Sequence, residues 1–215
     1  MTLNAPVGNQ PQGFAGSGGP SVGFTPVVVR TSAEILVNTA TLNDQAVPQI
    51  TSLVGGGFVV TWRDTSFGDG GAAGDISGYA IKAQVFTAAG TMTGTEILVN
   101  TATENDQTVA QVTALSNGGF VVVWQDTSFG VGGATGDASS NAVKAQLFTA
   151  AGAPVGSEIL VNTATANGQN AAQITALSDG GFVVTWTDNS VSGGDASSSA
   201  VRAQVFTAAG CHDRD

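Results

Sequence analysis

Apolar and polar residues alternate along short segments of the chain, with a period of two rather than the period of an amphipathic helix. In segment 58–62 two aromatic residues, Phe58 and Trp62, fall on one face of an extended strand, while valine and threonine fall on the other. Segment 79–86 alternates in the same way. No apolar stripe at helical spacing runs for a useful length, so we expect essentially no helix.

One pattern occurs three times along the chain. Its markers are the run Glu-Ile-Leu-Val-Asn-Thr-Ala-Thr and a later tryptophan, each recurring after 62 residues. The run begins at Glu34, Glu96 and Glu158, and the tryptophans are Trp62, Trp124 and Trp186. The third copy is shorter, because Gln84 to Gln146 is 62 residues and Gln146 to Gln204 is 58. The deletion falls in a Gly-rich loop, as expected if that loop is exposed.

The repeats divide the chain into five stretches. We expect repeats at 34–95, 96–157 and 158–210, an arm at 1–33 and a non-repeat tail at 211–215. The arm is rich in Gly, Pro, Ser and Gln, which predicts flexibility, and one further strand is expected at 25–30.

Each repeat contains four strand candidates, which in the first copy are 34–38, 49–53, 58–62 and 79–86. Apolar residues on both faces of these strands indicate that each sheet is covered on both sides, with the aromatic residues packed between sheets. The sequence therefore predicts an all-β fold of three tandem four-stranded antiparallel repeats that resemble the blades of a β-propeller.

The strand order leaves an edge open at each end of the repeats. Strand 34–38 has no repeat strand before it, and strand 201–206 has none after it. Three blades are too few for a ring, since propellers have about four to eight. Three alternatives remain: half of a two-fold homodimer with six blades formed by strand exchange, a fragment of a longer protein, or an open stack of sheets.

The composition narrows the classes of partner. With 16 acidic and 6 basic residues the net charge is −10, which repels phosphate backbones and attracts cations, so we expect no nucleic-acid partner. No apolar run approaches the roughly 18 residues of a membrane span, and the amino terminus shows no secretory signal. The single cysteine, Cys211, excludes an internal disulfide.

Two aspartates recur in every copy and are the best candidates for metal ligands. One follows the tryptophan and the other closes the Gly-rich loop, giving Asp64, Asp126 and Asp188, and Asp75, Asp137 and Asp195. Calcium takes about 6–8 oxygen ligands, which loop carboxylates and carbonyls supply well. Aspartates also cap turns through their own backbone. Calcium ligation and turn capping remain equal alternatives.

The remaining polar residues give no catalytic residue that we can name. A cation recurs at Lys82, Lys144 and Arg202, where we expect a structural ion pair with the acidic loops. The segment 19–23 matches Gly-x-Ser-x-Gly, but it lies in the arm and has proline where a strand-turn-helix is required. The only histidine, His212, lies in the tail.

The repeated units resemble those of large bacterial secreted and surface proteins. The units are Glu-Ile-Leu-Val-Asn-Thr-Ala-Thr, Gly-Gly-Phe-Val-Val-Thr-Trp and Ala-Gln-Val-Phe-Thr-Ala-Ala-Gly, and the resemblance to hemolysin-type, RTX-like calcium-binding proteins covers residues 34–210. It implies a calcium-binding module with an adhesion or scaffold role. It also implies an extracellular or cell-surface location reached by a non-classical exporter.

A calcium-dependent hydrolase is the alternative from a different class. Six-bladed propellers of the paraoxonase and gluconolactonase kind hold calcium in an axial channel, where it acts as a Lewis acid on lactones. By this analogy of fold, we would expect hydrolysis of lactones or esters, for example acyl-homoserine lactones. Carboxylates that converge on one channel would favour hydrolysis, and carboxylates at separate loops would favour structural calcium.

Overall fold

Eleven antiparallel strands in three separate sheets make up the part of the chain that the structure describes. The computed structural model describes residues 32–68, 74–131, 135–194 and 197–207, and the residues from Glu34 onward form one compact unit. Every regular element in these ranges is a strand, which confirms the all-β prediction. Accordingly, no helix in them could cross a membrane. The strand expected at 25–30 and the tail 211–215 lie outside the described residues.

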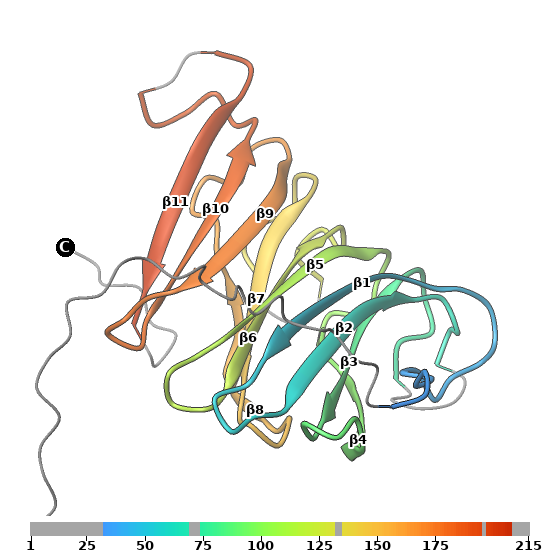
Figure 1. Cartoon of the computed structure of the whole chain (residues 1–215). Coiled ribbons are helices and arrows are strands. Elements are labelled where there is room, and N and C mark those ends of the chain that lie inside the picture. The colour runs from blue at the N-terminus through green and yellow to red at the C-terminus, as the bar shows by residue number, and fades with distance from the viewer. Residues whose placement is uncertain (1–31, 69–73, 132–134, 195–196, 208–215) are drawn as a thin grey trace, which may run out of the picture. The chain divides into compact units, whose positions relative to one another are not determined.

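The strands of each sheet lie in chain order (Figure 1). The first sheet consists of β1 (Gln45–Ser52), β2 (Phe58–Asp64), β3 (Ala80–Phe86) and β4 (Met92–Leu98). The second consists of β5 (Gln107–Ala114), β6 (Phe120–Asp126), β7 (Ala142–Phe148) and β8 (Pro154–Leu160). The third consists of β9 (Gln169–Ala176), β10 (Phe182–Asp188) and β11 (Ala200–Phe206). Four strands per sheet are thus confirmed for two sheets, whereas the third sheet has three among the described residues.

Each of the two complete sheets uses residues from two adjacent sequence repeats. The run that opens the second repeat forms the end of β4, the outer strand of the first sheet, and β8 completes the second sheet in the same way. The expected strand at 34–38 is not formed. A strand needs a neighbouring edge for its backbone hydrogen bonds, and no strand in the described ranges pairs with this segment.

A β-bulge recurs in the first strand of every sheet. In β1, two residues, Val47 and Pro48, lie opposite the single residue Trp62 of β2. Val47 has a φ of 55°, and the equivalent Val109 and Ala171 each have a φ of 53°, a region that branched side chains rarely adopt. The bulge interrupts the alternation, so the pattern alone predicted only 49–53 for this strand.

The sheets pack face to face through unlike faces. We call one the aromatic face, which in the first sheet carries Phe58, Val60, Trp62 and Phe86. The opposite, aliphatic face of the first sheet carries Val59, Ile81, Ala83 and Val85. The aromatic face of the second sheet packs on the aliphatic face of the first, and the third sheet packs on the second in the same way. The aromatic residues are therefore core, as predicted.

The two outermost faces of this arrangement are not covered to the same extent as the inner ones. On the aliphatic face of the third sheet, Val201 is 85% exposed, whereas its equivalents Ile81 and Val143 are 0% exposed. On the aromatic face of the first sheet, Pro48 is exposed, while its equivalents are buried. Substantial contacts join only adjacent sheets in the described residues, so the three sheets do not close into a ring.

Candidate functional site

A buried lysine connects three strands in each of the first two sheets. Lys82 Nζ on β3 lies 3.2 Å from Asp64 Oδ1 at the end of β2 and 3.2 Å from Glu96 Oε1 on β4. It also donates to Ser66 Oγ at 3.1 Å. The Lys82 side chain is 1% exposed, so this ion pair is shielded from water. The expected pairing of the cation with the acidic loop is confirmed.

The second sheet repeats this network with nearly the same distances. Lys144 Nζ lies 2.9 Å from Asp126 Oδ2 and 3.2 Å from Glu158 Oε1, and it donates to Ser128 Oγ at 3.3 Å. In the third sheet Arg202 takes the place of the lysine, and its Nε donates to Asp188 Oδ2. The Arg202 side chain is 26% exposed, because no fourth strand covers it among the described residues.

The aspartates that follow the tryptophans accept several further hydrogen bonds. Asp64 accepts from the backbone N of Ser66 at 2.9 Å and from Gln45 Nε2 at 3.2 Å. Burial raises the pKa of Asp64, but the hydrogen bonds from Ser66 and the charge of Lys82 outweigh it and hold the pKa below its usual value. At Asp188 burial opposes bonds from Ser190, Arg202 and Gln169, which lower its pKa to about 2.

The glutamate of the network binds the next stretch of chain. Glu96 Oε2 accepts hydrogen bonds from the backbone N and the Oγ1 of Thr39, both at 2.8 Å. Glu158 Oε2 accepts the same pair from Thr101, at 2.9 and 2.8 Å. Burial raises the pKa of Glu96, but the hydrogen bonds from Thr39 and the contact with Lys82 outweigh burial and hold the pKa below its usual value. The carboxylate is therefore stabilised in its charged form.

The aspartates of the Gly-rich loops have amide partners instead of a cation. Asp75 Oδ1 accepts from the backbone N of Ser77 at 3.1 Å, and Oδ2 accepts from Asn100 Nδ2 at 2.8 Å. Asp137 makes the equivalent bonds at 3.1 and 2.7 Å. Burial raises the pKa of Asp75, and its hydrogen bonds do not offset this. Asp195 lies outside the described residues.

Asn100 joins the first sheet to the second, a role that sequence reasoning missed. Its Oδ1 accepts from the backbone N of Ile81 at 2.9 Å. Its Nδ2 lies within hydrogen-bond distance of Asp75 Oδ2, of Ala102 O at 2.7 Å and of Gln107 Oε1 at 3.2 Å. Asn162 repeats these contacts between the second and third sheets. The sequence does contain a signal for this role, because Asn100 and Gln107 have equivalents at the same positions in every copy.

The predicted ligand residues are linked across the sheets by amide side chains. Asn100 lies within hydrogen-bond distance of Asp75 and Gln107, and Gln107 Nε2 donates to Asp126 Oδ1 at 3.2 Å. Asn162 and Gln169 link Asp137 to Asp188 in the same way. In the described ranges no group of three or more His, Cys, Asp or Glu side chains could hold a metal ion. Asp64 and Asp75 each accept from the backbone N–H two residues on, which is a turn-capping contact. Calcium ligation stays a prediction, and hydrolysis likewise stays a prediction.

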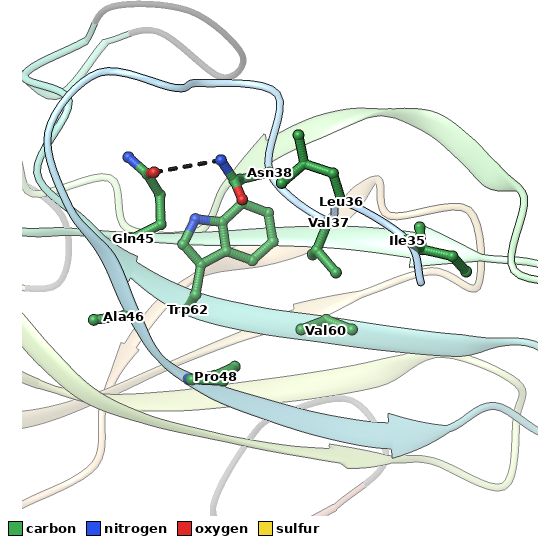
Figure 2. A pocket seen from close by; sticks show the side chains of 9 residues that line it. All are labelled: Ile35, Leu36, Val37, Asn38, Gln45, Ala46, Pro48, Val60 and Trp62. Atoms are coloured by element: carbon green, nitrogen blue, oxygen red, sulfur yellow. Dashed lines mark hydrogen bonds between the residues drawn. The ribbon is translucent and has the colours of Figure 1, made fainter. Parts of the chain in front are cut away.

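A pocket of about 280 Å³ lies on the aromatic face of the first sheet (Figure 2). Its lining consists of Ile35, Leu36, Val37, Asn38, Gln45, Ala46, Pro48, Val60 and Trp62. The two amides in this lining bond to each other, Asn38 Nδ2 to Gln45 Oε1 at 3.3 Å. None of these nine residues has a carboxylate, imidazole, thiol or hydroxyl group, so the pocket contains no general acid, general base or nucleophile of the usual kinds.

Neither family models nor curated proteins provide a match from which a function could be transferred. No family model matches the chain, and a search of the curated proteins finds none that matches either. The function must therefore be inferred from the sequence motifs and from the arrangement of the described residues.

Proposed function

We propose that the chain is a propeller-like repeat module of a secreted or surface bacterial protein, with a scaffold or adhesion role. The observation that carries this proposal is the use of the recurring polar residues. They are buried and paired with one another: the Lys82 and Lys144 networks join strands within a sheet, and Asn100 and Asn162 bond to glutamines of the next sheet. A catalytic group has to reach a substrate and exchange its partners, whereas these groups hold strands and sheets together.

The propeller-like character rests on strand order and packing. Blades of a propeller are four-stranded antiparallel sheets that pack face to face, and the last strand of each leads into the next. The first and second sheets have these properties, with β4 and β8 as the outer strands. A closed ring would need more sheets than the three described.

The calcium ligands in this proposal are the aspartates of the Gly-rich loops, Asp75 and Asp137. The oxygens of Asp64 already face an ammonium group, which a calcium ion would have to displace. Asp75 accepts hydrogen bonds from two N–H groups, and Asp137 accepts from two N–H groups and from the Ser139 hydroxyl, with no cation bonded to either carboxylate among the described residues. A carboxylate has about four acceptor positions, so these two retain capacity for a cation. Their place beside Gly-rich loops suits additional carbonyl ligands.

Labelling of intact cells tests the proposed location and role. Fab fragments raised against the folded chain should bind the surface of the producing cells, or the protein should be recovered from their medium. The same Fab should lower attachment of the cells to a surface, while an unrelated Fab should not. Protein found only inside the cells would contradict the proposal, and so would turnover of a lactone panel by the purified chain.

A further inference from the structure

The outer edge of β11 has the features that bind a fourth strand in the other two sheets. In the first sheet Val99 N donates to Ile81 O at 2.9 Å, and Ile81 N donates to Asn100 Oδ1 at 2.9 Å. In the second sheet the same two bonds join Val143 to the chain after β8, at 2.9 and 2.8 Å. The equivalent residue on β11 is Val201, and β11 is the edge strand of its sheet within the described ranges.

The third sheet also contains a site for a carboxylate. In the first sheet Glu96 binds Lys82 and Thr39, and in the second sheet Glu158 binds the equivalent lysine and threonine. The equivalent residues of the third sheet are Arg202, which is 26% exposed, and Thr163, which is exposed. In the described residues of this sheet no glutamate joins them.

The chain carries a segment that fits this edge and this site. Residues 34–41 are identical in sequence to 96–103 and to 158–165. Segment 34–41 already lies on the first sheet as its equivalent lies on the second, because Thr39 binds Glu96. Ile35 contacts the turn at Gly90, where a Cβ would lie 2.3 Å from its Cδ1, and Ile97 contacts Gly152 in the same way at 2.4 Å.

Among the described residues, no strand pairs with the side of this segment that faces away from the first sheet. Asn38 Nδ2 donates to Ala40 O at 2.5 Å and to Gln45 Oε1 at 3.3 Å, as Asn100 does to its equivalents. In the described part of the chain no backbone N–H donates to Asn38 Oδ1, whereas Asn100 Oδ1 accepts from Ile81. Leu36 is 66% exposed. The segment is therefore held close to the conformation that a strand donor needs.

The apolar faces at the two ends complement each other. Both inner junctions place an aromatic face on an aliphatic face. The aromatic face of the first sheet, which contains the pocket around Trp62, and the aliphatic face of the third sheet are the two faces without such a neighbour in the described ranges. On the latter, Val205 is 56% exposed, whereas its equivalents Val85 and Leu147 are each 3% exposed.

We propose that a second copy of this chain docks head to tail on the third sheet and donates its residues 34–38 as the fourth strand of that sheet. Leu36 then lies opposite Arg202 and Ile35 opposite Ala203, as Leu98 and Ile97 lie opposite Lys82 and Ala83. Glu34 accepts hydrogen bonds from Arg202 and Thr163.

This contact joins two different surfaces, so two copies close a ring of six sheets when each donates to the other, and otherwise the copies add in an open row. The inference goes beyond the proposed function, because it requires neither calcium nor a cell-surface location. A donation of residues 34–38 to β11 of the same chain is the competing arrangement.

Disulfide trapping between separately made variants tests the register. The variants Ile35→Cys and Ala203→Cys are prepared in a Cys211→Ser background and mixed under oxidising conditions. Paired residues of antiparallel strands have Cα atoms about 4.5–5.5 Å apart, which suits a disulfide. The mixture should give a cross-linked species of twice the chain mass. A control mixture of Ile35→Cys with Val54→Cys should not give it. Equal yields from the two mixtures, or an intrachain disulfide in the doubly substituted chain, would overturn the proposal.

Light scattering of the full chain tests the docking faces. Val201→Glu places a charge where an aromatic face should pack, so it should weaken self-association on the order of 100-fold while the monomer remains folded. Val54→Glu is the control, because Val54 is 67% exposed and its equivalents are Ser116 and Ser178. A dimer or an open-ended series that is lost only in Val201→Glu supports the proposal. A monomeric wild-type chain that also gives no disulfide in the trapping experiment overturns it.

Discussion

The two recurring aspartates of the first repeat, Asp64 and Asp75, lie in opposite electrostatic environments. Asp64 lies beside an ammonium group, and its pKa is lowered against the effect of burial. Asp75 is buried with amide donors, and its pKa is raised. The two carboxyl groups therefore change the free energy of unfolding in opposite directions as the pH changes. A rise in pH through the acidic range increases stability through Asp64, whose folded pKa is lowered, and decreases it through Asp75, whose folded pKa is raised.

Acid should destabilise the chain through Asp188. Its pKa is about 2 in the folded chain and 3.8 without interactions. Because the folded value is lower, the stabilisation is complete above the unfolded pKa and is lost as the pH falls from about 4 to 2. It amounts to about 2 kcal/mol. Urea unfolding across this range should show the loss, and Asp188→Asn should reduce its size. Glu104→Gln on the exposed surface is the control for removing one charge, and an identical acid limb in Asp188→Asn would contradict the assignment.

Calcium should act through Asp75 and Asp137 rather than through Asp64. A ligand that binds only the folded state at 100 times its Kd adds about 2.7 kcal/mol to stability. Calcium should therefore raise the Tm of the wild-type chain, chelator should reverse this, and the double variant Asp75→Asn/Asp137→Asn should lose the response. Asp64→Asn should be less stable with or without calcium. Melting curves that are the same with calcium and with chelator would remove calcium from the proposed function.

At the scale of elements, the asparagine after the outer strand decides how firmly two sheets are joined. Asn100→Ala leaves the buried Ile81 N–H without its acceptor and removes one of the hydrogen bonds to the Asp75 carboxylate. This should cost about 2–4 kcal/mol. Asn38→Ala, the same change in the same sequence context, loses bonds only to Ala40 and Gln45. It should cost about 1 kcal/mol or less in the monomer. Denaturant titration of both variants checks this, and equal losses would mean that the asparagine acts only locally.

The strands could be predicted from sequence because alternation and turn residues are local signals. The pattern placed β2 and β3 within two residues of their observed bounds, 58–64 and 80–86. It failed at β1, where the bulge at Val47 breaks the alternation. It also failed at 34–38, because pairing there depends on an edge that a single repeat does not contain.

The candidate site was predicted only in part, for a related reason. A cation and an acid that recur together indicate an ion pair, and this was confirmed for Lys82 and Asp64. Glu96, which pairs with Lys82, and Asn100, which bonds Ile81 and Asp75, come from the sequence repeat after that of their partners. Spacing within one repeat cannot show such contacts, since they depend on how the outer strand crosses between sheets.

At the scale of the whole molecule, the third sheet should be completed by supplying its fourth strand within the chain. Replacing residues 211–215 by a copy of 153–163 places a glutamate, a leucine and an asparagine where β8 has them. The charge-assisted bonds to Arg202 alone should add roughly 1–3 kcal/mol to stability. The same variant should no longer accept a strand from a second copy. Calorimetry and light scattering check the two effects, and a control segment with serine at those three positions should show neither.

The position of the outer strands at the start of the next repeat also bears on how the chain folds as it emerges from the ribosome. The first sheet can form a three-stranded core once β3 has emerged, but Lys82 gains Glu96 only when the second repeat begins. Each repeat that emerges therefore finishes the sheet before it and starts its own. Strand pairings remain local in sequence, which favours rapid folding and limits the time for which an apolar edge is unpaired. The chain can thus fold one sheet at a time, in step with its synthesis.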